Sequence, residues 1–270
     1  MKILIQSCIS RDVDIAKKAE AIGIEVVALP DRPCISLLAD LEAEEGKALI
    51  PSPVFCSLQV GRTIRRSFPT LARGLDMPLE FLRHGHYSAL LEPGLLLNGL
   101  GIYLPWSRVA PAKEMLAGLF GDMVFLRPDS PAKPFTGFAT TMSELAFELS
   151  AREQTDHVRP EEMVFLAKAR TLPEHEFRFW IIDSQVVTST SYSWDSAAGH
   201  LQPADALDEV ARSVARALER HCQNFVADFV LMNGTPLLVE LNAISTSGWY
   251  TGMDPAHLIA AMLRDFNWAS

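Results

Sequence analysis

The stretch FVADFVLMNGTPLLVELN, residues Phe225–Asn242, consists of two apolar runs separated by the dipeptide Asn233-Gly234. Both residues of this dipeptide tolerate a positive φ angle, so the stretch predicts a β-hairpin with a two-residue turn. The predicted strands are Phe225–Met232 and Thr235–Leu241. An antiparallel ribbon of this kind is the element from which we infer the fold of the second half of the chain.

Polar side chains interrupt both predicted strands. Asp228 lies in the first, Glu240 lies in the second, and Asn242 follows two positions later. Residues i and i+2 of a strand share a face, and a turn at Asn233-Gly234 places Asp228 nearly opposite Val239, beside Glu240. Three oxygen-bearing side chains then converge, as Mg²⁺ prefers. A solvent-facing row of carboxylates is the alternative, but an unpaired charge inside an apolar run is costly, which favours the metal site.

Composition limits the classes of protein. The 270 residues are 49% hydrophobic and 21% charged, which suits one large domain or two to three subdomains. The net charge of −9 argues against nucleic-acid binding, although it permits a local basic pocket. The four cysteines form no CxxC pair, so we expect reduced thiols. Neither a signal-peptide pattern nor a membrane-length apolar run occurs, and we expect a cytoplasmic protein that does not bind membranes.

The first region, residues 1–105, reads as α/β. Lys2–Ser7 and Glu25–Leu29 are predicted strands, and Asp12–Ile22 between them has helical periodicity, which is typical of a parallel βαβ unit. Further predicted elements are a strand at Val54–Leu58, mainly helix over Pro69–Leu91 with an interruption near Pro78, and a strand at Gly101–Trp106. No GxGxxG or GxxxxGK[ST] motif occurs, so any nucleotide site must be built in another way.

The second half reads as α+β with antiparallel ribbons. The predicted helices are Pro111–Phe120, Thr141–Ala151, Asp205–Gln223 and Ala256–Phe266, and the predicted strands outside the 225–242 hairpin are Met123–Arg127, Met163–Ala169, Phe177–Ile182 and Val186–Ser191. The last two strands form a hairpin around Asp183-Ser184.

Two further pairs of charged residues stand out in the second half of the chain. In VFLRPDSPAKPFTG (Val124–Gly137), a strand delivers Arg127 and a loop presents Lys133, so the two side chains can bracket a polyphosphate. Solvated cations on a surface loop are the alternative. Glu176 and Arg178 share one face of the strand EFRFWIID, where a cross-strand surface pair is the alternative to a site.

These segments resemble a known family. An Asp on one strand followed by Glu-x-Asn on the next, as in LVELNA (Leu238–Ala243), resembles the magnesium signature of ATP-grasp enzymes. The upstream RPD and KPFTG sequences resemble the arginine–lysine (R2K) clade of ATP-grasp carboxylate–amine ligases. The resemblance implies a Rossmann-like pre-ATP-grasp domain over residues 1–105. It further implies two α+β ATP-grasp lobes with antiparallel sheet, over residues 106–170 and 171–270.

The resemblance also implies roles for individual residues. Arg127 and Lys133 would contact the ATP phosphates, with Thr136 and Gly137 in the loop that covers them. Backbone groups near Phe165, Leu166, Ala167 and Lys168 would read adenine. Glu176 would face ATP, and Arg178, with Lys133 and Glu176, would be catalytic. Asp228, Glu240 and Asn242 would bind Mg²⁺. The residues implied to lie towards the acceptor substrate are Ser191, Tyr192, Ser245, Ser247 and Gly248.

The implied reaction is amide-bond formation on an amino-acid or peptide-like substrate. A carboxylate attacks the γ-phosphate of ATP, and an amine then displaces phosphate from the acyl-phosphate. The partners would be small-molecule or peptide carboxylates and amines, and a homodimer is compatible with this architecture. Two alternatives use the same scaffold, namely a kinase that stops at phosphoryl transfer and a non-catalytic ATP-binding interaction protein. An α/β protein with chance motifs is a third.

Overall fold

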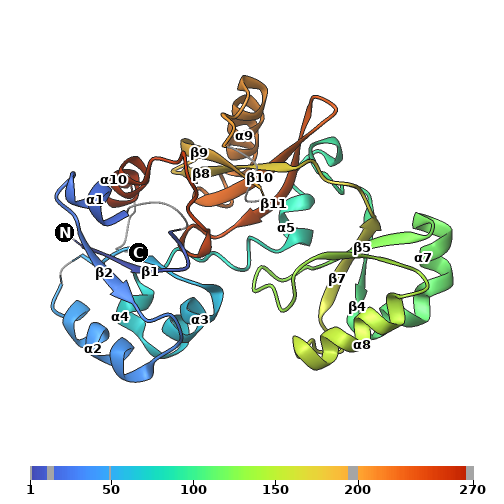
Figure 1. Ribbon diagram of the computed structural model, residues 1–270, viewed down its shortest axis with the longest axis horizontal. Coiled ribbons are helices and arrows are strands. Elements are labelled where there is room, and N and C mark those ends of the chain that lie inside the picture. The colour runs from blue at the N-terminus through green and yellow to red at the C-terminus, as the bar shows by residue number, and fades with distance from the viewer. Residues whose placement is uncertain (1, 11–14, 49, 194–199, 266–270) are drawn as a thin grey trace. The chain divides into compact units, whose positions relative to one another are not determined.

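The computed structural model describes residues 2–10, 15–48, 50–193 and 200–265, which form two compact units (Figure 1). The first unit comprises Met1–Pro78, Glu174–Phe229 and Leu241–Ser270, and the second comprises Leu79–Pro173 and Val230–Glu240. The predicted 225–242 hairpin is present as β10 (Phe225–Met232) and β11 (Thr235–Asn242). Its strands run from one unit into the other, so the hairpin contributes residues to both.

The chain opens with a parallel sheet. Strands β1 (Lys2–Gln6), β2 (Glu25–Leu29) and β3 (Val54–Phe55) lie in the order β2-β1-β3, and both pairs are parallel. Helix α1 (Ile15–Glu20) connects β1 to β2, which confirms the predicted βαβ opening. The start of the predicted helix, at residues 11–14, lies outside the described residues.

Successive residues of β1 point to opposite faces and join different cores. Leu4 packs with helices α2 (Ile35–Glu45), α3 (Leu58–Ser67) and α4 (Pro69–Ala72). Ile3 and Ile5 belong to a second core, which also contains residues of β8, β10 and α10 (Pro255–Asp265). Figure 1 shows α2, α3 and α4 gathered on one side of this sheet.

Trp249 is buried in that second core. Its indole meets the ring of Phe55 edge-on, with the ring centroids 4.7 Å apart. Its backbone N–H donates to the carbonyl oxygen of Ile9 at 2.7 Å. The segment after β11 is therefore fastened to the end of the N-terminal sheet.

The helix predicted over residues 69–91 is present only at Pro69–Ala72 and His84–Ser88, and the interruption predicted near Pro78 is confirmed but longer than expected. Helix α4 ends at Ala72, and the next helix in this stretch is α5 (His84–Ser88). Gly74 and Pro78 interrupt the helical pattern between them, as these residues commonly do. The strand predicted over Val54–Leu58 ends at Phe55, since Leu58 begins α3.

The second unit is built on an antiparallel sheet of order β4-β7-β5-β6. The strands are β4 (Gly101–Pro105), β5 (Met123–Pro128), β6 (Phe138–Thr141) and β7 (Met163–Lys168). Helices α6 (Trp106–Val109), α7 (Lys113–Phe120) and α8 (Leu145–Thr155) bury their apolar side chains against one face of it. Two short 3-10 helices are η1 (Pro93–Leu95) and η2 (Ala110–Ala112).

Residue alternation separates the two faces of this sheet. Val124, Leu126, Val164 and Leu166 belong to the core beneath the helices. The strand register pairs Phe165 with both Tyr103 and Arg127, and directly paired residues share a face. Tyr103, Phe165 and Arg127 therefore form a row across the opposite face.

The remaining sheet has the order β11-β10-β8-β9, with β8 at His175–Ile182 and β9 at Gln185–Ser193. Helix α9 (Asp205–Leu218) packs against β9, and a 3-10 helix, η3 (Ile244–Thr246), follows β11. Both predicted hairpin turns are confirmed by positive φ angles, 49° and 58° at Asp183 and Ser184 and 51° and 81° at Asn233 and Gly234. No helix among the described residues is long and apolar enough to cross a membrane.

Candidate functional site

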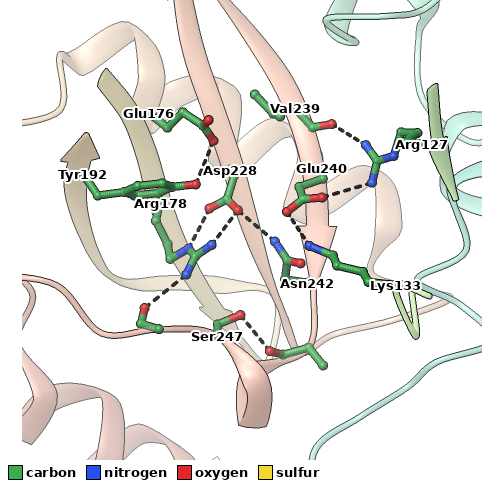
Figure 2. A network of polar contacts seen from close by, with 12 residues as sticks. Arg127, Lys133, Glu176, Arg178, Tyr192, Asp228, Val239, Glu240, Asn242 and Ser247 are labelled. Carbon is green, nitrogen blue, oxygen red and sulfur yellow. Dashed lines mark hydrogen bonds and ion pairs between the residues drawn. The ribbon is translucent and has the colours of Figure 1, made fainter. Parts of the chain in front are cut away.

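Glu240 meets the two cations of the predicted phosphate loop. Nη2 of Arg127 donates to one carboxylate oxygen at 3.1 Å, and Nζ of Lys133 donates to the other at 2.7 Å. Nη1 of Arg127 also donates to the carbonyl oxygen of Val239 at 2.9 Å. Figure 2 shows both cationic side chains pointing at the Glu240 carboxylate. Residues predicted from three separate segments are thus brought together in the second unit.

Arg127 is held in a polar setting although little of it is exposed. Burial alone would lower its pKa, but Tyr87, Glu240, Tyr103 and other neighbours raise the pKa above its ordinary value. The guanidinium therefore stays charged at every physiological pH. A permanently charged fork at a strand end is suited to a phosphate.

Lys133 occupies a tight turn. Its backbone φ is 44°, in the left-handed region that side chains other than glycine rarely adopt. Its N–H donates to the carbonyl oxygen of Ser130 at 3.0 Å, and the N–H of Ala132 donates to the Ser130 hydroxyl at 3.3 Å. This turn reverses the chain direction between β5 and the antiparallel strand β6. Thr136 and Gly137, the predicted covering residues, follow it and are exposed.

Asp129, which the sequence analysis quoted in the RPD sequence without assigning it a role, makes several short hydrogen bonds close to Arg127. One carboxylate oxygen accepts from Nε and Nη2 of Arg83 at 2.9 and 2.7 Å, and the other accepts from the N–H of Gly85 at 2.7 Å. Its backbone N–H donates to Met163, and its carbonyl oxygen accepts from His84. We call these bonds the Asp129 anchor. A lone Asp after Arg-Pro gave no signal for a partner 46 residues upstream.

The residues of β7, the strand predicted to lie against adenine, alternate between the two faces of the sheet. Phe165 and Ala167 lie on the face that carries Arg127, whereas Leu166 belongs to the core and Lys168 pairs with Val124 of the core face. The ring of His84 lies 4.2 Å from that of Phe165, and its Nδ1 is hydrogen-bonded to the Tyr103 hydroxyl at 2.6 Å. Burial, with the charge of Arg127 next, lowers the pKa of His84 to about 3, so the imidazole is neutral.

A second cluster lies in the first unit, around Asp228. Register pairs this residue of β10 with Arg178 of β8, and the guanidinium grips both carboxylate oxygens, from Nε at 2.7 Å and Nη2 at 2.8 Å. Nδ2 of Asn242 donates to the same carboxylate at 2.8 Å, and Nη1 of Arg178 donates to the Gly248 carbonyl at 3.1 Å (Figure 2). Asp228 is fully buried. Burial alone would lower the pKa of Arg178, but Asp228 raises it well above its ordinary value.

Two tyrosines lie next to this ion pair. The rings of Tyr192 and Tyr250 are stacked, with centroids 4.6 Å apart and planes 11° from parallel. The Arg178 guanidinium lies 5.0 and 5.4 Å from their centroids, within cation–π range. The Tyr192 hydroxyl donates to Glu176 at 2.7 Å. Glu176, Arg178 and Tyr192, all predicted from sequence, therefore belong to one polar network.

The predicted acceptor-side serines are bonded to the surrounding backbone. The Ser245 hydroxyl accepts from the N–H of Asp76 at 2.8 Å, and the Ser247 hydroxyl donates to the Ala243 carbonyl at 2.8 Å. The Ser191 hydroxyl accepts from the N–H of Leu201 at 2.7 Å. These bonds fix the loop after β11 and the end of β9 in place.

The comparisons with known proteins bear on what these clusters are. The family model described as "ATP-grasp domain, R2K clade family 3" matches residues 106–263, which is more than half of the chain. The chain belongs to this ATP-grasp family. The matched range includes Arg127, Lys133, Arg178, Asp228 and Glu240. A search of curated proteins found no match.

Several solved structures share the fold at low sequence identity, among them that of an ATP-grasp ligase. The ligase PsnB with its minimal precursor matches with a TM-score of 0.56 at 15% identity, over 98% of this chain and 100% of that chain. The D-cycloserine synthetase DcsG matches at 0.55 and 12%, over 97% and 98%. The macrocyclase MdnC from Microcystis aeruginosa MRC, bound with precursor peptide MdnA, matches at 0.53 and 13%, over 100% of both chains.

The donor set of this ATP-grasp chain fits magnesium by its chemistry. Asp228, Glu240 and Asn242 all offer oxygen, the ligand atom that this hard cation prefers. The bond from Nδ2 of Asn242 to Asp228 orients that amide and directs Oδ1 away from Asp228. Among the described residues, no group of three or more His, Cys, Asp or Glu side chains could hold a metal. One or two carboxylates with substrate phosphates are the usual Mg²⁺ arrangement, and by residue type Asp228 and Glu240 could supply such carboxylates.

Proposed function

We propose that the protein is an ATP- and Mg²⁺-dependent carboxylate–amine ligase that forms an amide bond through an acyl-phosphate. The observation that carries the proposal is the meeting of Arg127 and Lys133 at Glu240. A nucleoside triphosphate with its metal needs cations for the phosphates and a carboxylate for the metal. Arg127 and Lys133 could supply the cations, and Glu240 the carboxylate. Membership of the ATP-grasp family supports the same conclusion.

The nucleotide would exchange places with Glu240 at the two cations. Arg127 and Lys133 would bind the α- and β-phosphates, with Thr136 and Gly137 in the loop over them. Both cations donate to Glu240 in the structure, so bound phosphates would have to take over these donors. Phosphate binding then releases the Glu240 carboxylate for a metal. ATP and Mg²⁺ are thereby expected to bind cooperatively.

Adenine would lie against β7. Phe165 and Ala167 offer an apolar surface on the face that carries Arg127. The backbone of β7 is hydrogen-bonded to β4 on one side and β5 on the other. Direct reading of the base by backbone groups is therefore expected from Lys168 onward, where the strand ends, and Leu166 would contribute through the core.

Asp228, Glu240 and Asn242 would hold the magnesium. The bound ion would neutralise the charge that develops on the phosphates. Arg178 would stabilise the transferred phosphoryl group or an acyl-phosphate oxygen, because it remains charged and keeps donors beyond those given to Asp228. Glu176 would face the nucleotide and is oriented by Tyr192. Lys133 would add the charge that the leaving ADP requires.

The reaction would proceed in two steps that balance. A substrate carboxylate oxygen attacks the γ-phosphorus, the bond to the β-phosphate oxygen breaks, and ADP leaves. An amine then attacks the acyl carbon, loses a proton, and expels inorganic phosphate. The protein contributes position and charge rather than a covalent nucleophile.

The substrates are proposed to be amino-acid or peptide-like. PsnB and MdnC have been solved with precursor peptides, which supports a peptide as one partner. The candidates to border this substrate are Ser191, Tyr192, Ser245, Ser247 and Gly248. Since the serine hydroxyls are bonded to backbone groups, we expect them to set the shape of the loop, and Tyr192 and Gly248 to lie nearest the substrate.

We also propose the family's three-part organisation for this chain. Residues 1–105 would form a Rossmann-like pre-ATP-grasp domain, followed by lobes at 106–170 and 171–270. The parallel sheet β2-β1-β3 supports the first assignment, and the two antiparallel sheets support the lobes.

The test is a pair of measurements on the purified protein. Calorimetric titration with a non-hydrolysable ATP analogue should give binding that Mg²⁺ strengthens and that Lys133→Ala weakens. ADP release should then be screened over acids and amines, with hydroxylamine as a surrogate amine that converts an acyl-phosphate to a hydroxamate. ADP release with one acceptor and no hydroxamate would favour the kinase. No nucleotide binding in any condition would overturn the proposal.

A further inference from the structure

We infer that Asp129 is a positioning residue of the nucleotide site, and that Arg83 and the start of helix α5 act through it to fix Arg127 and Lys133. The inference rests on the proposed function, because it assigns these two cations to the phosphates. It brings into the site a segment, residues 83–85, that the sequence analysis assigned to the first region.

The position of Asp129 in the chain is the first argument. It lies two residues after Arg127 and four before Lys133, where β5 ends and the phosphate loop begins. Its backbone N–H donates to the carbonyl oxygen of Met163 at 2.9 Å, which extends the β5–β7 ladder by one bond. Contacts that hold Asp129 in place therefore hold the end of β5, from which the phosphate loop starts.

The side chain of Asp129 fixes that point from the opposite side. The carboxylate accepts three hydrogen bonds, two from the Arg83 guanidinium and one from the Gly85 N–H, all between 2.7 and 2.9 Å. The carbonyl oxygen accepts a fourth from the N–H of His84 at 3.0 Å. Asp129 is buried, so each bond counts more than it would in water.

The residues that meet Asp129 are themselves tightly packed. A Cβ at position 85 would lie 3.2 Å from Oδ1 of Asp129, a tight contact that would require the carboxylate to move by a few tenths of an ångström. His84 is bonded to Tyr103 and lies against Phe165, two members of the row that includes Arg127. The start of α5 is thus joined to the strand that carries Arg127 and to its neighbours.

The strained turn at Lys133 explains why the Asp129 anchor would matter for nucleotide binding. Lys133 lies in a left-handed turn that closes on Ser130, one residue after Asp129. A strained turn keeps its conformation only when the chain on either side is fixed. With Asp129 released, both the end of β5 and this turn can shift, and Arg127 and Lys133 would no longer be held in one geometry for the phosphates.

A merely structural ion pair would behave differently. It would lower the stability of the fold and leave the affinity of the folded protein for nucleotide unchanged. A positioning role predicts weaker binding of a triphosphate with a smaller effect on the binding of AMP, since Arg127 and Lys133 act on the polyphosphate. In turnover it predicts a raised KM for ATP with kcat little changed.

The experiment compares Asp129→Ala, Arg83→Ala and Arg83→Lys with the wild-type protein in calorimetric titrations with a non-hydrolysable ATP analogue and with AMP. Arg212→Ala is the matched control, because Arg212 makes an ion pair with Asp208 on α9, its side chain is 49% exposed, and it is distant in sequence from the phosphate loop. Thermal unfolding of each variant identifies those that fold. Arg83 has a half-exposed side chain, so its variants should fold even where Asp129→Ala does not.

We expect Arg83→Ala to weaken binding of the ATP analogue by about tenfold, the effect of losing one or two charge-assisted hydrogen bonds. Arg83→Lys should recover part of this loss, AMP binding should change less, and Arg212→Ala should match the wild type. Unchanged affinity in Arg83→Ala, or an equal loss for AMP, would overturn the anchor while leaving the proposed function standing. A wild-type protein that binds neither nucleotide would overturn both.

Discussion

The hairpin β10–β11 holds two carboxylates in contrasting environments. Asp228 is fully buried and is gripped by one arginine from the neighbouring strand, whereas Glu240 is 21% exposed in its side chain and is shared by Arg127 and Lys133. Arg178 and Asp228 are paired by sheet register. Lys133 reaches Glu240 from a loop.

The difference teaches which ion pair can be exchanged for a ligand. A buried bidentate pair is set by strands and is costly to break, because either partner alone would be a buried, uncompensated charge. A partly exposed carboxylate between two cations loses less when a phosphate replaces it. Asp228 and Arg178 are therefore expected to persist through binding, and Glu240 is expected to change partners.

The largest effect should come from breaking the buried pair. Arg178→Ala leaves the Asp228 carboxylate without its guanidinium, and we expect a loss of about 3–5 kcal/mol in the free energy of unfolding. Urea denaturation at pH 7 measures it. Arg159→Ala, which removes exposed ion pairs, should cost no more than about 0.5 kcal/mol. A loss below about 1 kcal/mol in Arg178→Ala would contradict the contrast between the two carboxylates.

Asp76 extends the comparison, since its carboxyl makes no ion pair with any residue that the structure describes. Burial raises the pKa of Asp76 to about 7, and a hydrogen bond with Asn224 offsets only part of this rise. The folded protein thus holds a proton that the unfolded chain releases near its usual carboxyl pKa. The stability this contributes is complete below about pH 4, and it is lost as the pH rises through 7.

The change in unfolding free energy between these limits is expected to reach about 4 kcal/mol, and Asp76→Asn should remove it. Urea denaturation of both proteins across this pH range measures the difference. Asp122→Asn, at an exposed position, is the control and should leave the pH profile unaltered. Parallel profiles for the wild type and Asp76→Asn would show that Asp76 is already ionised in the folded state.

If the phosphates replace Glu240 at the two cations, removing its charge should strengthen nucleotide binding in the absence of magnesium. Without magnesium, Glu240 competes with the phosphates for Arg127 and Lys133. Glu240→Gln should therefore bind a non-hydrolysable ATP analogue in EDTA about tenfold more tightly than the wild type, while losing the strengthening by Mg²⁺. Calorimetry in EDTA and in magnesium measures both. Glu161→Gln, an exposed carboxylate paired with Arg159, is the control. Weaker binding in EDTA would exclude competition.

The smallest expected effect concerns Lys133, where two substitutions distinguish the role of the ammonium group from that of the left-handed backbone. Lys133→Ala and Lys133→Gly both remove the ammonium and should weaken nucleotide binding alike. Their stabilities should differ, because glycine accepts the φ of 44° that alanine resists, and we expect the glycine variant to be more stable by about 1 kcal/mol. Thermal or urea unfolding of the pair decides. Equal stabilities would mean that the turn rearranges once the lysine is removed.

Local signals in the sequence were enough for most strands and turns. Asn233-Gly234 and Asp183-Ser184 predicted their hairpins because positive φ is a property of the dipeptide itself. The apolar runs placed β2, β7 and β10 to within a residue. Helix α2 was missed because it exposes Ile35 and Leu37, which obscures its amphipathic pattern.

The contacts of the site depended on pairings far apart in the chain. The residue types at Arg178, Asp228 and Glu240 indicated chemistry, but the sequence did not reveal that Arg178 grips Asp228 across 50 residues. Asp129 was quoted in the RPD sequence without a role, because its partners Arg83, His84 and Gly85 lie at the start of a short helix, far away in the sequence. Register and long-range anchors follow from the packed fold rather than from any local pattern.

Trp249 gives the molecule a built-in optical reporter. It lies in the core against Phe55, between Gly248, whose carbonyl accepts from Arg178, and Tyr250, which stacks on Tyr192. Its emission should therefore respond when a ligand disturbs Arg178 or the tyrosine pair. Substrates could then be screened by tryptophan fluorescence before any product is known.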